Sequence, residues 1–241
     1  MNEHVEILKD NNEYYGFYGS LFLSNSDINA LLYNPAAFKK KKEKTPEMVK
    51  GSYLHASLLE PEKVANFMVY KGTSRNNKGY KEQVPEGEVW LLEPEVEELK
   101  AMAEAVRANM IIWEMLYDDV VGYEMPATGV IGGLAWKGKA DVVKENVIYD
   151  VKTTSKLDDF MFSARKYNYD SQAWIYNQLF GKPVVFIAVE KETNRIGVFD
   201  CSDEFLDRGR EKVMRAIDQY NKFFGESKTE DPNTFIIKAT L

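Results

Sequence analysis

The spacing of hydrophobic residues predicts that the first half of the chain is mainly helical. Apolar residues recur there at every third or fourth position, behind residues that favour helix starts. We expect helices after an N-cap at Ser24 or Ser26, at residues 46–59 and at residues 94–117, the last of these long and amphipathic. Residues 71–88 are rich in Gly, Asn, Lys and Glu and predict a surface loop.

The pattern changes to short β-type runs in the second half. β-Branched and aromatic runs fill residues 119–153 and are interrupted at 127–129, 132–133 and 144–146, which is typical of a small antiparallel meander. Further along we expect helices near 157–166 and 170–180, strands near 183–190 and 195–200, and a closing helix at 203–224. This order predicts an α/β fold, in which a mixed central β-sheet is flanked by helices and preceded by an N-terminal helical segment.

Length and composition indicate one folded unit. With 241 residues and 44% hydrophobic content, we expect a single domain over 1–241, mostly helical at 1–118 and with its core at 119–225. The one cysteine, Cys201, excludes an intramolecular disulfide and a cysteine-based metal cluster, and it favours a cytoplasmic setting. The acidic N-terminus differs from a secretion signal and no apolar run reaches about 18 residues, so we expect no membrane association.

The formal net charge of −7 argues against a general polyanion-binding protein, although a local site can carry its own cations. Two basic segments can hold phosphates or simply form solvated surface. They are a lysine run with Lys39, Lys40, Lys41, Lys42 and Lys44, and the loop with Arg75, Lys78 and Lys81.

Two aspartates and a lysine interrupt two strands that otherwise look buried. If Glu145 and Asn146 form a two-residue turn, Asp141 lies directly opposite Asp150, and Lys152 shares their face. Buried carboxylates at that spacing repel each other and need a positive charge nearby. Lys152 supplies part of this charge, and a divalent cation supplies it more completely. The pattern therefore fits either a salt-bridged cluster at a sheet edge or a metal and phosphate site.

These three residues belong to a longer series of motifs. Its members are Gly51-x-x-x-His55 with Leu59-Glu60-Pro61, Gly138-x-x-Asp141, Asp150-Val-Lys152-Thr-Thr154 and Gln172-x-x-x-Tyr176. In this order the motifs resemble the PD-(D/E)xK nuclease superfamily, and more narrowly its branch with RecB-type nuclease domains and exodeoxyribonuclease VIII. The resemblance covers residues 20–225 and implies a restriction-endonuclease-like core.

The resemblance implies roles for five residues of the central motifs. Asp141 and Asp150 would be metal ligands, with the main-chain carbonyl of Val151 as a third. His55 would add a metal ligand or a phosphate contact. Lys152 would orient or activate the attacking water and stabilise charge that develops on the phosphate. The implied ion is Mg²⁺, for which Mn²⁺ is expected to substitute.

Four further residues are candidates for the same site. Gln172 and Tyr176 are four positions apart, so on a helix they share one face, and the resemblance implies that they contact the substrate or shape the ligands. Glu60 matches a feature of the family or ends its helix before Pro61. Glu124 is in a strand expected beside that of Asp141, as an outer carboxylate of the metal site or as a solvent-facing residue.

The implied activity is that of a Mg²⁺-dependent deoxyribonuclease. Resemblance to exodeoxyribonuclease VIII implies a 5′-to-3′ exonuclease on double-stranded DNA ends, which leaves single strands for an annealing partner in phage-type recombination and can form a homo-oligomeric ring. A restriction-like or structure-specific endonuclease is the enzymatic alternative, and a non-catalytic DNA-binding module with the same fold is an alternative of another class. The cluster-bearing nucleases of CRISPR adaptation are excluded, because they need four cysteines and this chain has one.

Overall fold

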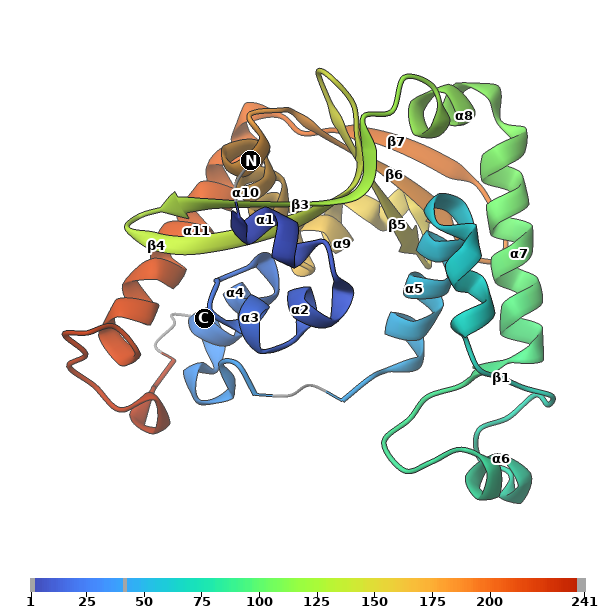
Figure 1. Ribbon diagram of the computed structural model, residues 1–241, viewed down its shortest axis with the longest axis horizontal. Coiled ribbons are helices and arrows are strands. Elements are labelled where there is room, and N and C mark those ends of the chain that lie inside the picture. Colours follow the sequence, from blue (N-terminus) through green and yellow to red (C-terminus); the bar gives the residue numbers. More distant parts are fainter. Residues whose placement is uncertain (1–2, 41–42, 238–241) are drawn as a thin grey trace.

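The computed structural model describes residues 3–40 and 43–237, and a mixed five-stranded sheet forms its centre (Figure 1). Its strands lie in the order β3 (Gly122–Ile131), β4 (Leu134–Val143), β5 (Ile148–Thr154), β6 (Val184–Glu190) and β7 (Ile196–Asp200). The first three form an antiparallel meander, β6 runs parallel to β5, and β7 is antiparallel to β6. The mixed sheet flanked by helices confirms the predicted fold class.

Helices cover both faces of this sheet, and each face has its own hydrophobic core. On one face, Trp136, Ile148 and Phe186 pack with residues of α4 (Asn25–Tyr33), α9 (Phe160–Lys166), α10 (Tyr169–Phe180) and α11 (Asp203–Phe223). On the other face, Val142, Val151 and Ile187 pack with residues of α5 (Pro46–Leu59), α7 (Glu93–Ala108) and α8 (Met110–Tyr117). None of the described helices combines the length and apolar character needed to cross a bilayer.

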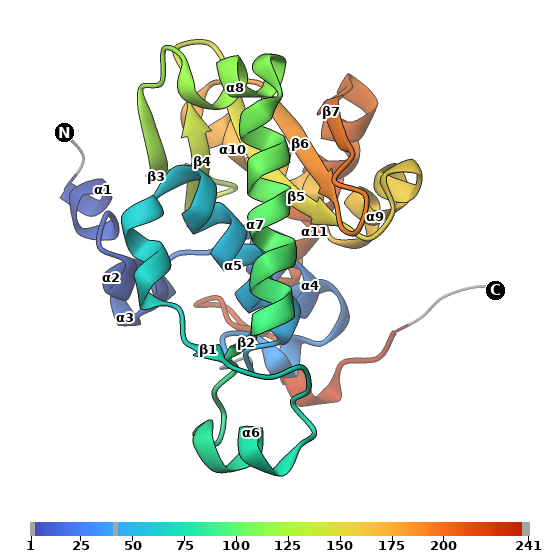
Figure 2. The ribbon, with the colours of Figure 1, turned by 90° about the vertical axis from the view of Figure 1, so that its right-hand side faces the viewer.

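Smaller elements surround this core. Three short helices precede α4 and enclose a small core of Leu8, Tyr14 and Phe22: α1 (Glu3–Leu8), α2 (Asn11–Tyr15) and α3 (Phe17–Ser20). The 3-10 helices are η1 (Pro35–Ala37), η2 (Pro61–Asn66), η3 (Leu157–Asp159) and η4 (Pro232–Thr234). Figure 2 shows α6 (Lys78–Gln83) projecting from one end of the molecule, below the two-stranded parallel sheet of β1 (Val69–Tyr70) and β2 (Leu91–Leu92).

Three predicted elements were wrong in detail. The helix at 94–117 is broken at Asn109, which has an extended backbone and accepts hydrogen bonds from the main-chain N–H groups of Ile111 and Ile112 as the N-cap of α8. The strand β3 continues through 127–129, where a turn was expected, because its pairing with β4 is unbroken there. The expected loop at 71–88 contains α6, which the side chain of Asn77 caps.

The turn between β4 and β5 sets the geometry of the predicted site. Val142 pairs with Tyr149 and Val143 with Ile148, as expected for the proposed two-residue turn. The ladder ends there, and no backbone pairing joins Asp141 to Asp150 in the described structure. Instead, Val151 donates its main-chain N–H to Asp141 Oδ2 at 2.7 Å. The two strands diverge where Asp141 and Asp150 lie.

We expect alanine substitutions at the two glycines of the β3–β4 hairpin to lower the free energy of unfolding by different amounts. Gly132 and Gly133 have φ of 57° and 79°, and a Cβ on Gly132 would lie 2.7 Å from Ile217 of α11, whereas nothing lies within 4 Å of one on Gly133. Gly133→Ala should lower the free energy of unfolding by about 1–2 kcal/mol through the left-handed backbone alone. Gly132→Ala should lower the free energy of unfolding by more than Gly133→Ala, as measured by chemical denaturation. Equal losses for the two variants would contradict the close packing of Gly132 against Ile217.

Candidate active site and metal centre

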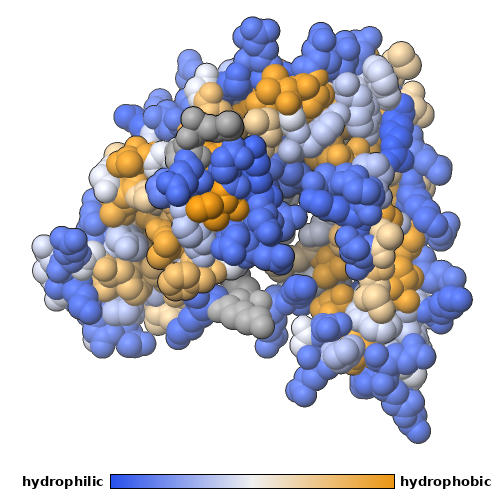
Figure 3. Space-filling view, viewed as in Figure 1, coloured by the Kyte–Doolittle hydropathy of each residue, from blue (hydrophilic) through white to orange (hydrophobic). Residues whose placement is uncertain are grey.

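A cavity of about 540 Å³ opens beside β4 between α5, α10 and the N-terminal helices. Figure 3 shows the surface hollowed between the N-terminal helices and the side of the molecule that carries α5. Residues of three of the four predicted motifs line it, together with Glu124: Gly51, His55, Glu60, Glu124, Gly138, Asp141, Gln172 and Tyr176. The motif with Asp150 and Lys152 lies behind this lining and reaches it through Gln172. The fold therefore gathers segments separated by more than a hundred residues into one space.

Asp150 and Lys152 form an ion pair beneath the cavity. Both side chains project from the same face of β5, and the Lys152 ammonium contacts Asp150 Oδ1 directly. The other carboxylate oxygen of Asp150 accepts a hydrogen bond from Gln172 Nε2 at 2.8 Å. Asp150 is fully buried, so these contacts with the side chains of Lys152 and Gln172 fix the orientation of its carboxylate.

His55 reaches the site from α5, on the opposite face of the sheet from α10. Its Nε2 donates to the main-chain carbonyl of Val151 at 2.8 Å, which directs Nδ1 toward the carboxylates. That nitrogen lies 3.3 Å from Asp141 Oδ2 and 3.9 Å from Glu124 Oε1. The imidazole thus bridges β5 to the acidic side chains of β3 and β4.

Burial and mutual repulsion shift the protonation of these groups. Burial and, after it, the neighbouring charge of Asp141 raise the pKa of Asp150 to about 6, against the opposing charge of Lys152. Burial also raises the pKa of Asp141. Burial alone would lower the pKa of His55, but the carboxylates of Asp141 and Glu124 outweigh it and raise that pKa to about 9. At neutral pH a protonated His55 therefore supplies positive charge to the acidic cluster.

Glu124 occupies an unusual backbone position at this cluster. It lies directly opposite Asp141, between the pairs Tyr123 with Val142 and Met125 with Ala140, and the ladder is interrupted there. Its φ of 48° is in the left-handed region, which costs a non-glycine residue about 1–2 kcal/mol. Such strain is characteristic of functional sites, and here it accompanies a carboxylate directed at His55.

Gln172 and Tyr176 connect α10 to both strands of the site. Gln172 Nε2 donates to Asp150 and also to Tyr176 Oη at 3.1 Å, and Tyr176 Oη donates to the main-chain carbonyl of Lys139 at 2.5 Å. The tyrosine ring lies against Gly138, where a Cβ would come within 2.8 Å of it. The glycine of one motif thus makes room for the tyrosine of another, and their spacing in the sequence has a packing explanation.

The donor set fits a divalent cation. Ligand atoms of His55, Glu124 and Asp141 all lie within 4.8 Å of one another, and oxygen and imidazole donors suit such ions. Buried Asp150 Oδ1 is held by the ammonium of Lys152, so Asp150 lies beside this donor set as part of an ion pair. The charge now supplied by protonated His55 is the charge that a bound cation would replace.

Val151 and Glu60 are the remaining candidate residues. The carbonyl of Val151 accepts its hydrogen bond from His55, and its service as a metal ligand stays a prediction. Glu60 lines the cavity and pairs with Lys63 at 2.5 Å, so it is both the C-cap of α5 and part of the site wall. The roles of all these residues in catalysis likewise stay predictions.

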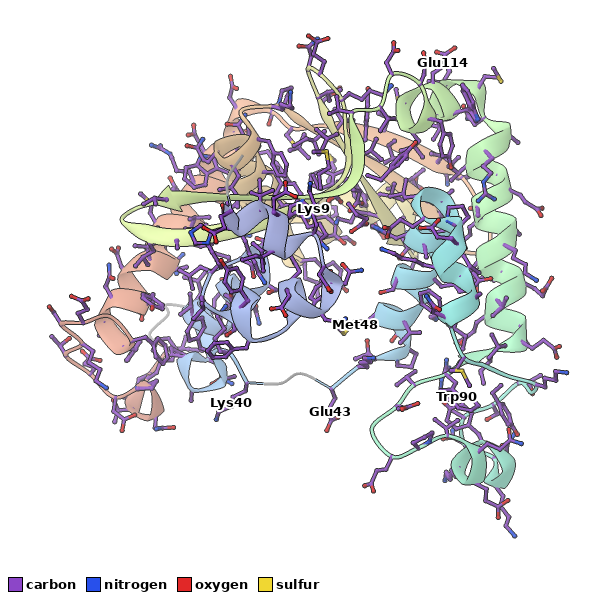
Figure 4. All side chains as sticks on the ribbon, viewed as in Figure 1. Lys9, Lys40, Glu43, Met48, Trp90 and Glu114 are labelled. Carbon is purple, nitrogen blue, oxygen red and sulfur yellow. The ribbon has the colours of Figure 1, made fainter. Side chains whose placement is uncertain are left out.

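Neither basic segment lines the cavity among the described residues. Arg75 binds the carboxylate of Glu95 through both of its terminal nitrogens, and Lys78 lies 3.6 Å from Glu82. Lys39 donates to Asp27 and to a main-chain carbonyl. Figure 4 shows Lys40 pointing outward from the surface. Residues 41 and 42 lie outside the described structure, and phosphate binding by either segment stays a prediction.

Several cavity residues were missed by the sequence analysis. Lys137 and Lys139 alternate with Asp141 along β4, and this two-residue period was a usable signal. Asn11, Tyr14 and Tyr15 come from α2, which carries no motif, so only the tertiary structure reveals them.

Comparison with known proteins shows the family of this chain. The family model described as a PDDEXK-like domain of unknown function (DUF3799) matches residues 24–233. Because this match spans most of the chain, the protein belongs to that family and hence to the PD-(D/E)xK nuclease superfamily. A search of curated proteins found no match. The narrower likeness to exodeoxyribonuclease VIII stays a prediction.

One solved structure shows the same fold. A protein from Eubacterium rectale described as a "putative exonuclease" is 15% identical, with a TM-score of 0.67 over 93% of this chain and 92% of that one. The structure of SSO0001 is 14% identical, with a TM-score of 0.32 over 78% of this chain and 83% of that one. A TM-score this low does not establish a shared fold. At 15% identity the first likeness establishes the shared architecture.

The backbone of Glu124 can be tested with two matched variants. Glu124→Gly and Glu124→Ala both remove the carboxylate, but only glycine adopts the left-handed conformation without a steric cost. We expect Glu124→Gly to be more stable than Glu124→Ala by about 1 kcal/mol in chemical denaturation. If the alanine variant is equally stable, the strand relaxes once the side chain is gone, and the strain is not imposed by the fold.

Proposed function

We propose that this protein is a Mg²⁺-dependent deoxyribonuclease that degrades double-stranded DNA from its ends, in the 5′-to-3′ direction. The observation that supports it most is the convergence of Asp141, Asp150, Lys152 and His55 at the point where β4 and β5 diverge. A non-catalytic DNA-binding module would gain nothing from two buried carboxylates, one of which raises the pKa of the other. Membership of the PD-(D/E)xK superfamily supports the same class of chemistry.

In this proposal Asp141, Asp150, Glu124 and His55 hold the metal ion. The ion would stabilise negative charge on the scissile phosphate and lower the pKa of a water ligand when bound. For His55 to bind through Nδ1 it must lose the proton that the acidic cluster now holds on it, so metal binding would release a proton. Val151 keeps the imidazole oriented by accepting its Nε2–H.

Lys152 acts as a cation in this mechanism. Burial alone would lower its pKa, but Asp150 and Asp141 outweigh burial and raise it, so the amine is protonated at neutral pH. It therefore orients the attacking water and stabilises charge on the phosphate and does not accept a proton. Gln172 holds the far oxygen of Asp150, which keeps the ion pair with Lys152 in place.

The wider features of the proposal follow from the family resemblance. We infer a single nuclease domain, Mn²⁺ as a substitute for Mg²⁺, a cytoplasmic setting and single-stranded products that an annealing protein would receive. A homo-oligomeric ring around the duplex belongs to the same proposal. A restriction-like or structure-specific endonuclease is the competing enzymatic function, because the same residues serve either reaction.

The activity is tested with end-labelled linear duplex and a covalently closed circle. We expect Mg²⁺-dependent release of nucleotides from the linear DNA, abolition by EDTA and loss of at least about 100-fold in rate for Asp150→Asn, which removes the charge that holds Lys152. Asp200→Asn, an exposed carboxylate on β7, is the matched control and should cleave as wild type does. Cleavage of the circle would favour the endonuclease, and an inert wild type would reject the nuclease proposal.

Metal binding should be visible without any DNA. Because a ligand held only by the native state stabilises it, Mn²⁺ or Mg²⁺ at 100 times its dissociation constant should add about 2.7 kcal/mol to the stability of wild type. Asp141→Ala should lose most of this gain in thermal unfolding, whereas Asp200→Asn should keep it. The same gain in wild type and Asp141→Ala would place the ion elsewhere.

A further inference from the structure

Two lysines in the cavity wall lack the counter-charge that buried ammonium groups need. Lys137 and Lys139 are each 7% exposed, and no described carboxylate oxygen lies within 4.0 Å of either amine. An anion that entered the cavity beside Lys139 would supply the missing charge there.

The positions of these lysines relative to Asp141 indicate which anion fits. Residues 137, 139 and 141 alternate along β4, so they follow one another at about 6.7 Å along the same cavity. The cavity lining is acidic at Glu124 and Asp141, beside His55. Farther along β4 it is basic, at Lys139 and Lys137. A DNA strand presents its phosphates as a regular row, so one phosphate at the acidic end brings the next toward Lys139.

The contacts of the two lysines differ. Lys137 donates to the main-chain carbonyl of Tyr14 and occupies the space left by Gly19, where a Cβ would lie 2.4 Å from its amine. That lysine ties the N-terminal helices to β4. Lys139 is held only by side chains in the described structure: Asn11 Oδ1 at 2.5 Å and the ring faces of Tyr14 and Tyr15, at 4.4 and 5.6 Å. Asn11 and Tyr15 are exposed and can rotate to admit a phosphate, whereas Tyr14 is fixed in the small core with Leu8 and Phe22.

We propose that Lys139 binds the phosphate adjacent to the scissile one on the DNA strand, and that Asn11 of α2 positions its amine. This inference rests on the proposed nuclease function and adds a substrate subsite to it. Because α2 precedes the residues matched by the family model, the N-terminal helices would complete the substrate site of this chain. Lys137, one step farther along β4, serves as the matched structural control.

The test measures binding of a fluorescein-labelled blunt duplex by anisotropy in EDTA, so that hydrolysis does not interfere, over a series of salt concentrations. Lys139→Gln should reduce the slope of log affinity against log salt by about 0.7–0.9, the contribution of one phosphate contact, and Lys139→Arg should keep it. Lys137→Gln should lower the midpoint of thermal unfolding and leave the salt slope unchanged. Lys139→Met, which retains the aliphatic stem, replaces Lys139→Gln if that variant does not fold.

Kinetics with Mg²⁺ add a readout that a purely structural role would not move. Asn11→Ala should raise KM for the duplex and leave kcat at saturating DNA unchanged, because it positions a binding group. An unchanged salt slope in Lys139→Gln, or an equal loss in Lys137→Gln, overturns the assignment of Lys139. If the wild-type protein neither binds nor cuts DNA, the nuclease function itself is rejected. If the wild-type protein cuts DNA and Lys139→Gln keeps the wild-type salt slope, only the assignment of Lys139 is overturned.

Discussion

The need to compensate two buried carboxylates governs the structure around the cavity. Asp141 and Asp150 are desolvated, and burial raises the pKa of each. The chain answers with a cation on each side of the sheet: His55 from α5 beside Asp141, and Lys152 beside Asp150. Positive charge is thus built into the chain beside each of the two buried carboxylates.

The same constraint explains why the strands separate where they do. Direct pairing of Asp141 with Asp150 would set two carboxylates face to face, whereas the observed geometry gives Asp141 the N–H of Val151. Opening the ladder also leaves room for His55 on one face of the sheet and for Gln172 on the other. A local departure from regular β-structure therefore creates the space in which donors from three elements meet.

Sequence patterns predicted the sheet, its register at Val142 and Val143, and the approach of His55 and Gln172 to one site, because each follows from hydrophobic period, turn length or motif. They missed the break at Asn109, since a capping asparagine inside an apolar run looks like helix until the packing of α8 is known. They could not place α2 in the cavity, because its contacts to β4 join residues more than a hundred positions apart. Tertiary contacts between distant segments leave no local signal.

The distribution of the site along the chain also has a consequence for biosynthesis. His55 belongs to α5 and Gln172 to α10, and the crossover that carries α10 lies between the parallel strands β5 and β6. During synthesis on the ribosome, β4 with Asp141 is made before α10. The side chain of Gln172 on α10 then holds Asp150 beside Lys152. The contacts around Asp150 are therefore complete only after α10 has docked against the sheet.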